Sequence, residues 1–328
     1  MLLGINFHYI RPDFNFPFSG IHGISPKRFK EQLTILSKQG EFVSQQQITK
    51  AICGEGTLPS KSIAITFDDG LKEQYDYALP VLESMGIPAT FYFNSINASD
   101  GVISPIHKSH YIRANNSALE VIEKVQNIAR SLGFEQFDLD ELSHKAKNVY
   151  PYDEESDACL KYYLNRDLPS TLSSEIMVRL WKDLVDKDET QLASEWYMDT
   201  NQITSLGRKG MLGSHGHEHL SMAQQSHPDR ENQIRRTFNF LRELEINTSC
   251  QSFSFPYGSK DSCCSSIKPI LSKYDLRFSW TMERAVNTDL NDPFFLARIS
   301  CSDAPGGNHA HPSCNNIFES LPKSKWFK

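Results

Sequence analysis

Two apolar runs joined by a helix-like segment restrict the fold of this chain more than any other stretch. The runs "SIAITF" (62–67) and "PATFYF" (88–93) are typical of buried strands, and "KEQYDYALPVLESMG" (72–86) between them is typical of a helix. Strand, helix and strand with short connections make up the unit from which parallel sheets and barrels are built. The sequence therefore predicts an α/β fold with parallel strands.

The same alternation recurs on both sides of a segment that looks different. The predicted strands are 2–10, 211–216, 250–258 and 276–282, and the predicted helices are 25–40, 201–210, 230–245 and 265–274. Residues 101–190 show helical periodicity without a convincing strand, and the tail from about 304 looks irregular. We therefore expect a single domain over 1–328 that carries a helical insertion at about 101–190.

Composition excludes several classes of protein. The hydrophobic fraction of 39% and the charged fraction of 23% are ordinary for a folded globular chain. A net charge of −6 without a Lys/Arg cluster argues against a nucleic-acid partner. No run approaches the ~20 apolar residues of a membrane-spanning helix, and "MLLGINFHYIRPDF" lacks the basic start of a signal peptide. Seven scattered cysteines suit reduced thiols. We expect a cytoplasmic protein.

Asp68 and Asp69 follow the strand at 62–67 directly, although adjacent carboxylates repel each other and Asp is a poor strand former. The carboxyl ends of parallel strands are where α/β folds place their chemistry. "DDG" also fits a plain solvated turn, because Asp and Gly are turn formers. A nearby metal ion would explain the pair, since one carboxylate would bind the ion while its neighbour accepted a proton from water.

Three histidines stand close together in "GSHGHEHLSM", just after another predicted strand. In a helical turn His215 and His219 share a face, whereas in an extended segment His217 joins them. In either case two imidazoles and one carboxylate form a set suited to a divalent metal, zinc first, with a position left open for water. Asp69 is the carboxylate that would complete the set, which leaves Asp68 as the proton acceptor.

A tight turn ends a third strand at "FSFPYG" (253–258). It closes a strand–helix unit in the ordinary way, but a Pro-aromatic-Gly turn at a strand end can also direct a backbone N–H into the site. Such an N–H stabilises the oxygen on which negative charge develops during acyl transfer.

The three segments together resemble the motifs of the polysaccharide deacetylase family, the NodB-like homology domain of carbohydrate esterase family 4. They are "TFDDG" (66–70), "GSHGHEH" (213–219) and "FPYG" (255–258), and the resemblance covers about 1–100 and 190–303. It implies a distorted (β/α) barrel, a divalent metal and hydrolytic removal of an N-acyl group, usually acetyl, from an amino sugar. It also implies the residue roles: Asp68 as general base, Asp69, His215 and His219 as metal ligands, and the Tyr257 N–H as oxyanion donor. His217 falls where the family is variable.

The chain departs from the family pattern at two motif positions. Gly216 stands where the family usually has Ser or Thr, and Ser254 stands where it usually has the Arg that holds the catalytic Asp. A branch of the family without that Arg has a "PRI"-like segment at the place of "FFLARI" (294–299) here. "FFLARI" is predicted to be a strand with Arg298 at its end, from which Arg298 is expected to contact Asp68, because a guanidinium forms paired bonds to a carboxylate that Lys cannot copy.

The family motif that supplies the general acid is not recognisable in this chain. The candidates for the proton donor are histidines outside the three motifs: His107, His110, His309 and His311. Because the insertion leaves the scaffold directly after "TFYF", at a strand end on the catalytic side, it is expected to cover the open end of the barrel and to bring His107 or His110 to the site.

The resemblance implies a metal-dependent deacetylase acting on an amino sugar or glycan. Its helical insertion, the segment "WYM" (196–198) and the "ARISCSDAP"-like end resemble deacetylases linked to bacterial surface-polysaccharide synthesis, which suggests a nucleotide- or lipid-linked precursor as substrate. A deformylase or another amide hydrolase would use the same residues with a different cleft. A carbohydrate-binding relative without activity is the third reading, and it gives no reason for retaining Asp68.

Overall fold

The computed structural model describes residues 1–13, 23–134, 138–151, 153–310 and 316–327. They divide into two compact units. The first consists of the described residues of 1–13, 23–102 and 190–327, and the second of those of 103–189. The second unit is the segment for which a helical insertion is predicted.

The first unit is built on parallel strands. They are β1 (Leu2–Phe7), β2 (Glu41–Phe42), β3 (Ser62–Phe67), β4 (Ala89–Phe93), β5 (Leu212–Ser214), β6 (Ser252–Ser254), β7 (Phe278–Trp280) and β8 (Arg298–Ser300). Their order in the sheet is β7-β6-β5-β4-β3-β1-β8, with β2 beside β3, and every pair is parallel. Crossovers between neighbours give each strand the same direction, so all carboxyl ends meet at one end of the sheet.

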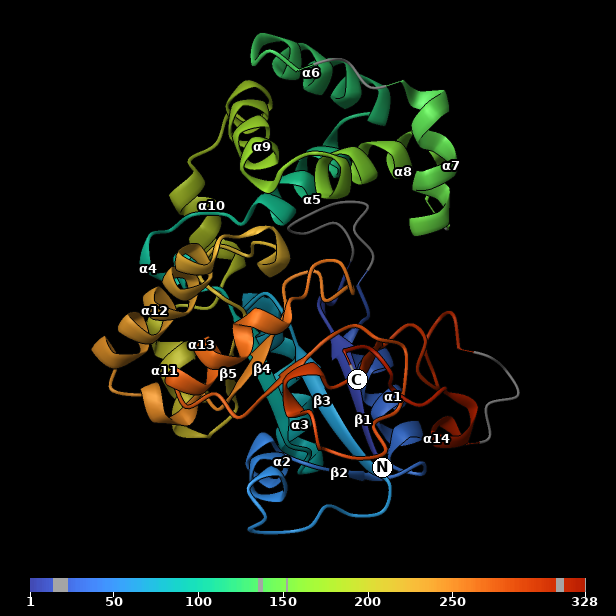
Figure 1. The fold of residues 1–328 in the computed structure, drawn as a ribbon, viewed down its shortest axis with the longest axis vertical. Helices are drawn as coiled ribbons and strands as arrows, with labels where there is room; N and C mark the ends of the chain where they lie inside the picture. The colour runs from blue at the N-terminus through green and yellow to red at the C-terminus, as the bar shows by residue number, and fades with distance from the viewer. Residues whose placement is uncertain (14–22, 135–137, 152, 311–315, 328) are drawn as a thin grey trace. The chain divides into compact units, whose positions relative to one another are not determined.

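The two outer strands of this sheet come close to closing it into a barrel. Trp280 of β7 forms a parallel bridge to Leu296, two residues before β8, and the Leu296 N–H donates to the Ser279 carbonyl at 2.9 Å. Helices of the same unit lie around the strands (Figure 1). The fold is a nearly closed (β/α) barrel, which confirms the predicted fold class.

The helices of the first unit are α1 (Pro26–Leu36), α2 (Gln45–Ile52), α3 (Leu79–Met85), α4 (Ser95–Ser99), α11 (Thr200–Arg208), α12 (His227–Glu243), α13 (Lys268–Lys273) and α14 (Ile317–Ser320). Helix α2 was not among the predicted helices, although Ser44 and Gln47 form a capping box at its start. Helix α12 begins earlier than expected, because Ser226 caps it and Pro228 occupies its first turn.

The predicted helix at 72–86 forms in two parts. A π-helical turn covers Gln74–Ala78, and α3 continues from Leu79. Pro80 has no N–H to donate to the carbonyl four residues earlier, so the wider turn before it avoids a lost hydrogen bond in a regular helix.

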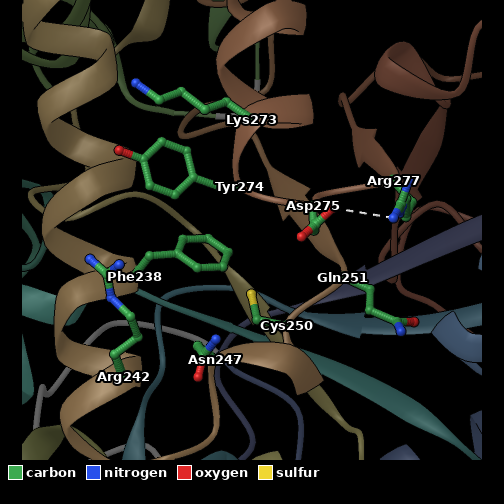
Figure 2. Close-up of a pocket in the computed structure, with 9 residues that line it drawn as sticks. All are labelled: Phe238, Arg242, Asn247, Cys250, Gln251, Lys273, Tyr274, Asp275 and Arg277. Carbon is green, nitrogen blue, oxygen red and sulfur yellow. Dashed lines mark hydrogen bonds and ion pairs between the residues drawn. The ribbon is translucent and has the colours of Figure 1, made fainter.

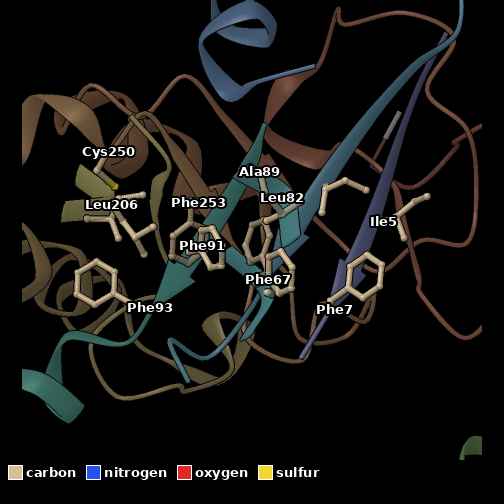
Figure 3. Packing of buried hydrophobic residues seen from close by; sticks show 14 of the residues in the cluster. Ile5, Phe7, Phe67, Leu82, Ala89, Phe91, Phe93, Leu206, Cys250 and Phe253 are labelled. Carbon is tan, nitrogen blue, oxygen red and sulfur yellow. The ribbon is translucent and has the colours of Figure 1, made fainter. Parts of the chain in front are cut away.

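Successive side chains of β1 and β3 point to opposite sides of the barrel wall. On the outside, Phe7 and Phe67 are stacked with ring centroids 5.4 Å apart, and Phe67 stacks on Phe91 of β4 at 4.7 Å (Figure 3). Phe29 of α1 meets Phe7 and Phe67 edge-on. This layer between strands and helices is the main core, and burial of its aromatic rings stabilises the barrel.

The inside of the barrel is apolar at the level of Gly4 and Trp280 and becomes polar towards the carboxyl ends of the strands. Trp280 is buried beside Gly4, where a Cβ would lie 2.8 Å from Trp280 Cζ3 and 2.6 Å from the Cβ of Arg298. Only glycine leaves room for both side chains at this level. Above it, Asn6 and Thr66 face each other across β1 and β3, with a 3.0 Å hydrogen bond from Thr66 Oγ1 to Asn6 Oδ1.

The second unit is helical in its described residues. Its helices are α5 (Pro105–Asn115), α6 (Ala118–Ser131), α7 (Leu139–Val149), α8 (Glu155–Tyr162) and α9 (Ser170–Leu184), and α10 (Glu189–Trp196) begins at its boundary with the first unit. α7 packs on α8, and α5 and α6 both pack on α9. An ion pair between Arg113 and Asp157, 2.7 Å long, joins α5 to α8.

The tail from 304 contains more structure than predicted. Helix α14 forms within it, and Ile317 and Phe318 are buried in the main core. Beyond them, Glu283 accepts hydrogen bonds from the N–H groups of Lys325 and Trp326. The prediction missed this because α14 is a single turn, too short to show a period.

Two remaining observations concern only the described residues. Their six cysteines form no disulfide. Among their helices, none has the length and apolarity required to cross a bilayer.

Candidate metal centre

The predicted motif residues meet at the carboxyl ends of neighbouring strands. Asp68 and Asp69 follow β3, the histidine loop 215–219 follows β5, and Pro256 and Tyr257 follow β6. Because all strands run parallel, segments that are far apart in sequence come together at this end of the barrel.

Asp69, His215 and His219 are buried and form one group. Their ligand atoms all lie within 4.8 Å of one another. The Nε2 atoms of His215 and His219 are 3.5 and 3.4 Å from the same oxygen of Asp69, Oδ1. These are the three residues predicted as metal ligands, and their donor atoms converge on one point.

The protonation of His215 shows why this group fits a cation. Its Nδ1 lies 2.7 Å from the Ser254 carbonyl oxygen, which only accepts, so Nδ1 carries the proton. Burial lowers the pKa of His215, which favours the neutral ring. The Nε2 lone pair then faces a carboxylate oxygen, and the two would repel each other unless a positive ion lay between them. A carbonyl that fixes the tautomer of a ligand histidine is the usual outer-shell support of a metal site.

The backbone around this group is strained. Asp69, His219 and Tyr257 have φ angles of +79°, +55° and +62°, in the left-handed region that non-glycine residues rarely adopt. Gly70 also has a positive φ, and a Cβ there would lie 2.8 Å from the Cβ of Phe93. Left-handed residues cost about 1–3 kcal/mol each and cluster at functional sites.

His217 is buried but belongs to a different contact. Its Nδ1 lies 2.7 Å from the Ser95 hydroxyl, at the start of α4. Burial, with help from the charge of Arg236, lowers its pKa to about 4, so its ring is neutral. His217 does not belong to the Asp-His-His group. Because Gly216 and His219 have left-handed backbone angles, the loop is neither a regular helix nor an extended strand, and its histidine side chains point in different directions.

Arg298 makes the predicted contact with Asp68. Its Nη1 donates to Asp68 Oδ1 at 2.9 Å, and its Nη2 donates to Asp68 Oδ2. Arg298 is the first residue of β8, not the end of a strand as predicted from "FFLARI". Its long side chain runs up the inside of the barrel, past Thr66 and Asn6, and bonds to both with Nη1 at 3.2 and 2.9 Å.

Further bonds fix the Asp68 carboxylate. Asn6 Nδ2 donates to its Oδ2 at 3.0 Å, and the Ser254 hydroxyl donates to the same oxygen at 3.2 Å. Ser254 also accepts from Arg298 Nη2 at 2.6 Å, so the small residue at the family's Arg position occupies the space between the two charged groups. Burial tends to raise the pKa of Asp68, but the guanidinium of Arg298, together with the neighbouring His215 and His8, outweighs burial and the pKa is lowered. Asp68 is therefore held as an oriented carboxylate.

Tyr257 contacts the Asp-His-His group through His219. Its ring is edge-on to that of His219, with centroids 5.0 Å apart. The left-handed conformation of Tyr257 and Gly258 makes the turn after β6 tight, as the motif suggested.

His8 is a residue that the sequence analysis missed. It follows β1 directly, and the neighbouring Asp68 N–H donates to the Phe7 carbonyl at 3.1 Å. Asn6, two residues before His8, points inward to Asp68. Because side chains two residues apart on an extended chain lie on the same side, His8 is expected on the side of Asp68. His8 is exposed, and its charge contributes to the lowered pKa of Asp68. Its position directly after a strand, like that of Asp68, was the available signal.

Tyr9 and Arg11 were also missed. The Arg11 guanidinium lies 4.4 Å above the Tyr9 ring and binds both carboxylate oxygens of Glu73, at 3.2 and 2.7 Å. Burial, together with the negative charge of Asp69, raises the pKa of Tyr9, so its phenol stays protonated beside the Asp-His-His group.

The histidines predicted as proton donors lie in different places. His107 and His110 are on α5 of the second unit, with ring centroids 5.9 Å apart. His309 is exposed in the segment after β8, and His311 lies outside the described residues. An approach of His107 or His110 to the metal-binding group stays a prediction, as does coverage of the barrel by the insertion.

A cavity of about 360 Å³ lies between α12 and the end of α13 (Figure 2). Its residues 247–251 precede β6, and its residues 273–277 precede β7, so it lies at the amino ends of these strands, opposite the Asp-His-His group. Lys273 is bonded to Glu231, and Arg277 to Asp275 at 3.2 Å. These two cations of the cavity wall are therefore already paired with carboxylates of the same chain.

Comparisons with known proteins agree with the motifs. Residues 55–136, from just before β3 into the second unit, match the model of the polysaccharide deacetylase family. No curated protein matches the chain.

Solved structures with the same fold cover nearly the whole chain. IcaB from Ammonifex degensii has a TM-score of 0.53 and 17% identity over 95% of this chain and 93% of its own. The Streptococcus pyogenes deacetylase PplD, solved with acetate, has a TM-score of 0.52 and 13% identity, over 91% of this chain and 90% of its own. A de-N-acetylase from Aggregatibacter actinomycetemcomitans has a TM-score of 0.51 and 12% identity, over 91% of this chain and 94% of its own. The match of residues 55–136 to the family model, the barrel and the strand-end motifs all indicate similarity to the polysaccharide deacetylase family.

Proposed function

We propose that this protein is a metal-dependent hydrolase that removes the N-acetyl group from an amino sugar. One observation carries the proposal: a buried Asp-His-His group stands directly beside a second carboxylate, Asp68, which Arg298 holds in place. The fold is also that of a deacetylase solved with acetate and of a de-N-acetylase. A binding protein would need neither the strain nor the buried charge at Asp68.

Asp69, His215 and His219 would hold the ion. Two imidazoles and one carboxylate suit zinc, and three protein ligands leave a position open. A divalent ion bound there would supply Lewis acidity and lower the pKa of a water molecule.

The residues of the chain divide the remaining chemistry among them. Hydrolysis joins a water oxygen to the acyl carbon, breaks the C–N bond and releases acetate and a free amine. Asp68, whose lowered pKa keeps it ionised, accepts the proton of the attacking water. The Tyr257 N–H donates to the acyl oxygen as negative charge develops on it. The leaving amine requires a proton, and we assign its donor as His8, because this residue directly follows β1 beside Asp68.

Replacement of His8 tests this assignment. His8→Gln is expected to lower kcat for an N-acetyl sugar by about 10²–10⁴-fold, because the amine would leave unprotonated. Metal content should not change, since His8 is outside the ligand group. The loss should shrink with an activated acetate ester, whose leaving group needs no proton. His309→Gln is the matched control, and equal losses in both variants would exclude His8 as the donor.

Arg298→Lys tests how Asp68 is held. Lysine keeps the charge but cannot form the paired bonds to Asp68 together with those to Asn6 and Ser254. Without them the pKa of Asp68 rises, because burial is no longer outweighed. Asp68 must be ionised to accept a proton, so the acidic limb of the kcat profile should move to higher pH, with a lower plateau. An unchanged pH profile in this variant would contradict the role of Arg298.

The substrate class is part of the proposal. We favour a precursor of a surface polysaccharide, nucleotide- or lipid-linked, on the strength of the insertion and the "ARISCSDAP" segment. The test is metal analysis of the purified protein followed by acetate and formate release from UDP-linked amino sugars, N-acetylated oligosaccharides and simple N-acyl amines. Acetate from the sugars supports the proposal. Formate release, or turnover of simple amides alone, would point to a different amide hydrolase, and no turnover with bound metal to a binding protein.

A further inference from the structure

The loop 215–219 carries two of the metal-binding residues without regular secondary structure. Gly216 and His219 have φ angles of +79° and +55°. A Cβ at Gly216 would lie 3.1 Å from Met222 Cε, and its left-handed backbone disfavours any side chain. The backbone conformation at this position therefore disfavours the Ser or Thr that usually stands here in the family.

One side of the loop is held by the start of α4. Asn94 Nδ2 donates to the His215 carbonyl at 2.7 Å, and the Ser95 N–H donates to the Gly216 carbonyl at 3.4 Å. With the Ser95–His217 contact, these bonds fix residues 215–217. They end two residues before His219.

Gln233 of α12 holds the next part of the loop. Its Oε1 accepts from the N–H groups of His217 and Glu218, at 3.1 and 2.8 Å, and its Nε2 donates to Glu218 Oε2 at 2.5 Å. The side chain is almost fully buried, at 2% exposure, where unpaired polar groups are costly. Both ends of one amide are thus bonded to residues 217 and 218, which directly precede His219.

We propose that Gln233 is a positioning residue for the metal centre. It keeps His219 in its left-handed conformation, with Nε2 directed at Asp69 Oδ1. This inference rests on the proposed metal site and adds to it a residue outside the three motifs, fourteen positions beyond the last ligand in a different element. Loss of an outer-shell partner typically weakens metal binding about 10–100-fold.

The chain offers a matched pair of variants. Gln233→Met keeps the length of the side chain but removes the amide. Gln45→Met does the same to another buried glutamine, on α2, whose Nε2 donates to the carbonyls of Gly210 and Leu212 at 2.8 and 2.9 Å. Gln45 lies at the amino end of β5, and Gln233 contacts the loop at its carboxyl end. Both variants should lose stability, but only Gln233→Met should lose metal affinity.

A charge swap tests the geometry independently of folding losses. Gln233→Glu keeps an acceptor for the two N–H groups but sets two carboxylates against each other at Glu218. The double variant Gln233→Glu/Glu218→Gln restores one donor and one acceptor in exchanged places.

The measurements are Zn²⁺ affinity by chelator competition, the absorption spectrum of the Co²⁺-loaded protein and the midpoint of thermal unfolding. We expect about 10–100-fold weaker affinity in Gln233→Met, an altered Co²⁺ spectrum, wild-type affinity in Gln45→Met, and recovery in the double variant relative to Gln233→Glu. Wild-type affinity in Gln233→Met, or equal losses in both methionine variants, would overturn the inference. If Gln233→Met does not fold, a double variant no better than Gln233→Glu would overturn it. A wild-type protein that binds neither ion would instead refute the proposed metal site.

Discussion

Replacement of His219 by alanine is expected to remove the bound metal and the activity together. Its Nε2 is one of the three donor atoms converging on a single point, and two remaining donors, Asp69 and His215, make a much weaker site. The measurement is metal content of the purified protein by elemental analysis, alongside acetate release. Because the metal supplies the Lewis acidity of the reaction, we expect activity to fall to the background of the assay.

The histidine loop provides its own control. His217 is two residues away and equally buried, but it contacts Ser95 and not the metal-binding group. His217→Ala should therefore retain the metal, whatever it costs in stability. Metal loss in His217→Ala together with retention in His219→Ala would exchange the two roles and refute the ligand set.

Asp68→Asn should separate chemistry from metal binding. Asn has nearly the same shape but cannot accept a proton from water, so we expect kcat to fall by about 10²–10⁴-fold while the metal stays bound. The proposed ligand of the ion is the adjacent Asp69, whose Oδ1 faces the Nε2 atoms of both histidines. Acetate release and metal content measured on one preparation check both halves.

The same variant should also be less stable. Arg298 is fully buried, and without the Asp68 charge it keeps only neutral partners, Asn6, Thr66 and Ser254. Removing one partner of a buried ion pair costs about 3–5 kcal/mol, so the folded fraction must be checked by circular dichroism before kcat is compared. Full activity in folded Asp68→Asn would remove the proposed base, and loss of metal equal to that of Asp69→Asn would assign Asp68 to the ion.

The strand pattern and the chemistry of the motifs could be predicted from the sequence because both are local. A strand is visible in its run of apolar residues, and a carboxylate directly after a strand must lie at the end of the sheet. Short elements escaped this approach: α2, α4 and α14 have too few turns to show a period, and only the capping box at Ser44 marked the first of them. The start of β8 was also misplaced, because "FFLARI" is apolar well before its first ladder hydrogen bonds.

Residue types and their order determined the resemblance to a family, the parallel fold, the candidate ligands Asp69, His215 and His219, and the expected pairing of Arg298 with Asp68. Only the tertiary structure decided which of three neighbouring histidines turns away, because left-handed angles at 216 and 219 reverse side-chain directions that spacing alone leaves open. It also decided the places of His8 and Gln233, which carry no motif. Their positions depend on β1 lying beside β3 and on α12 packing against the loop after β5, and such contacts between distant segments arise from packing rather than from any local pattern.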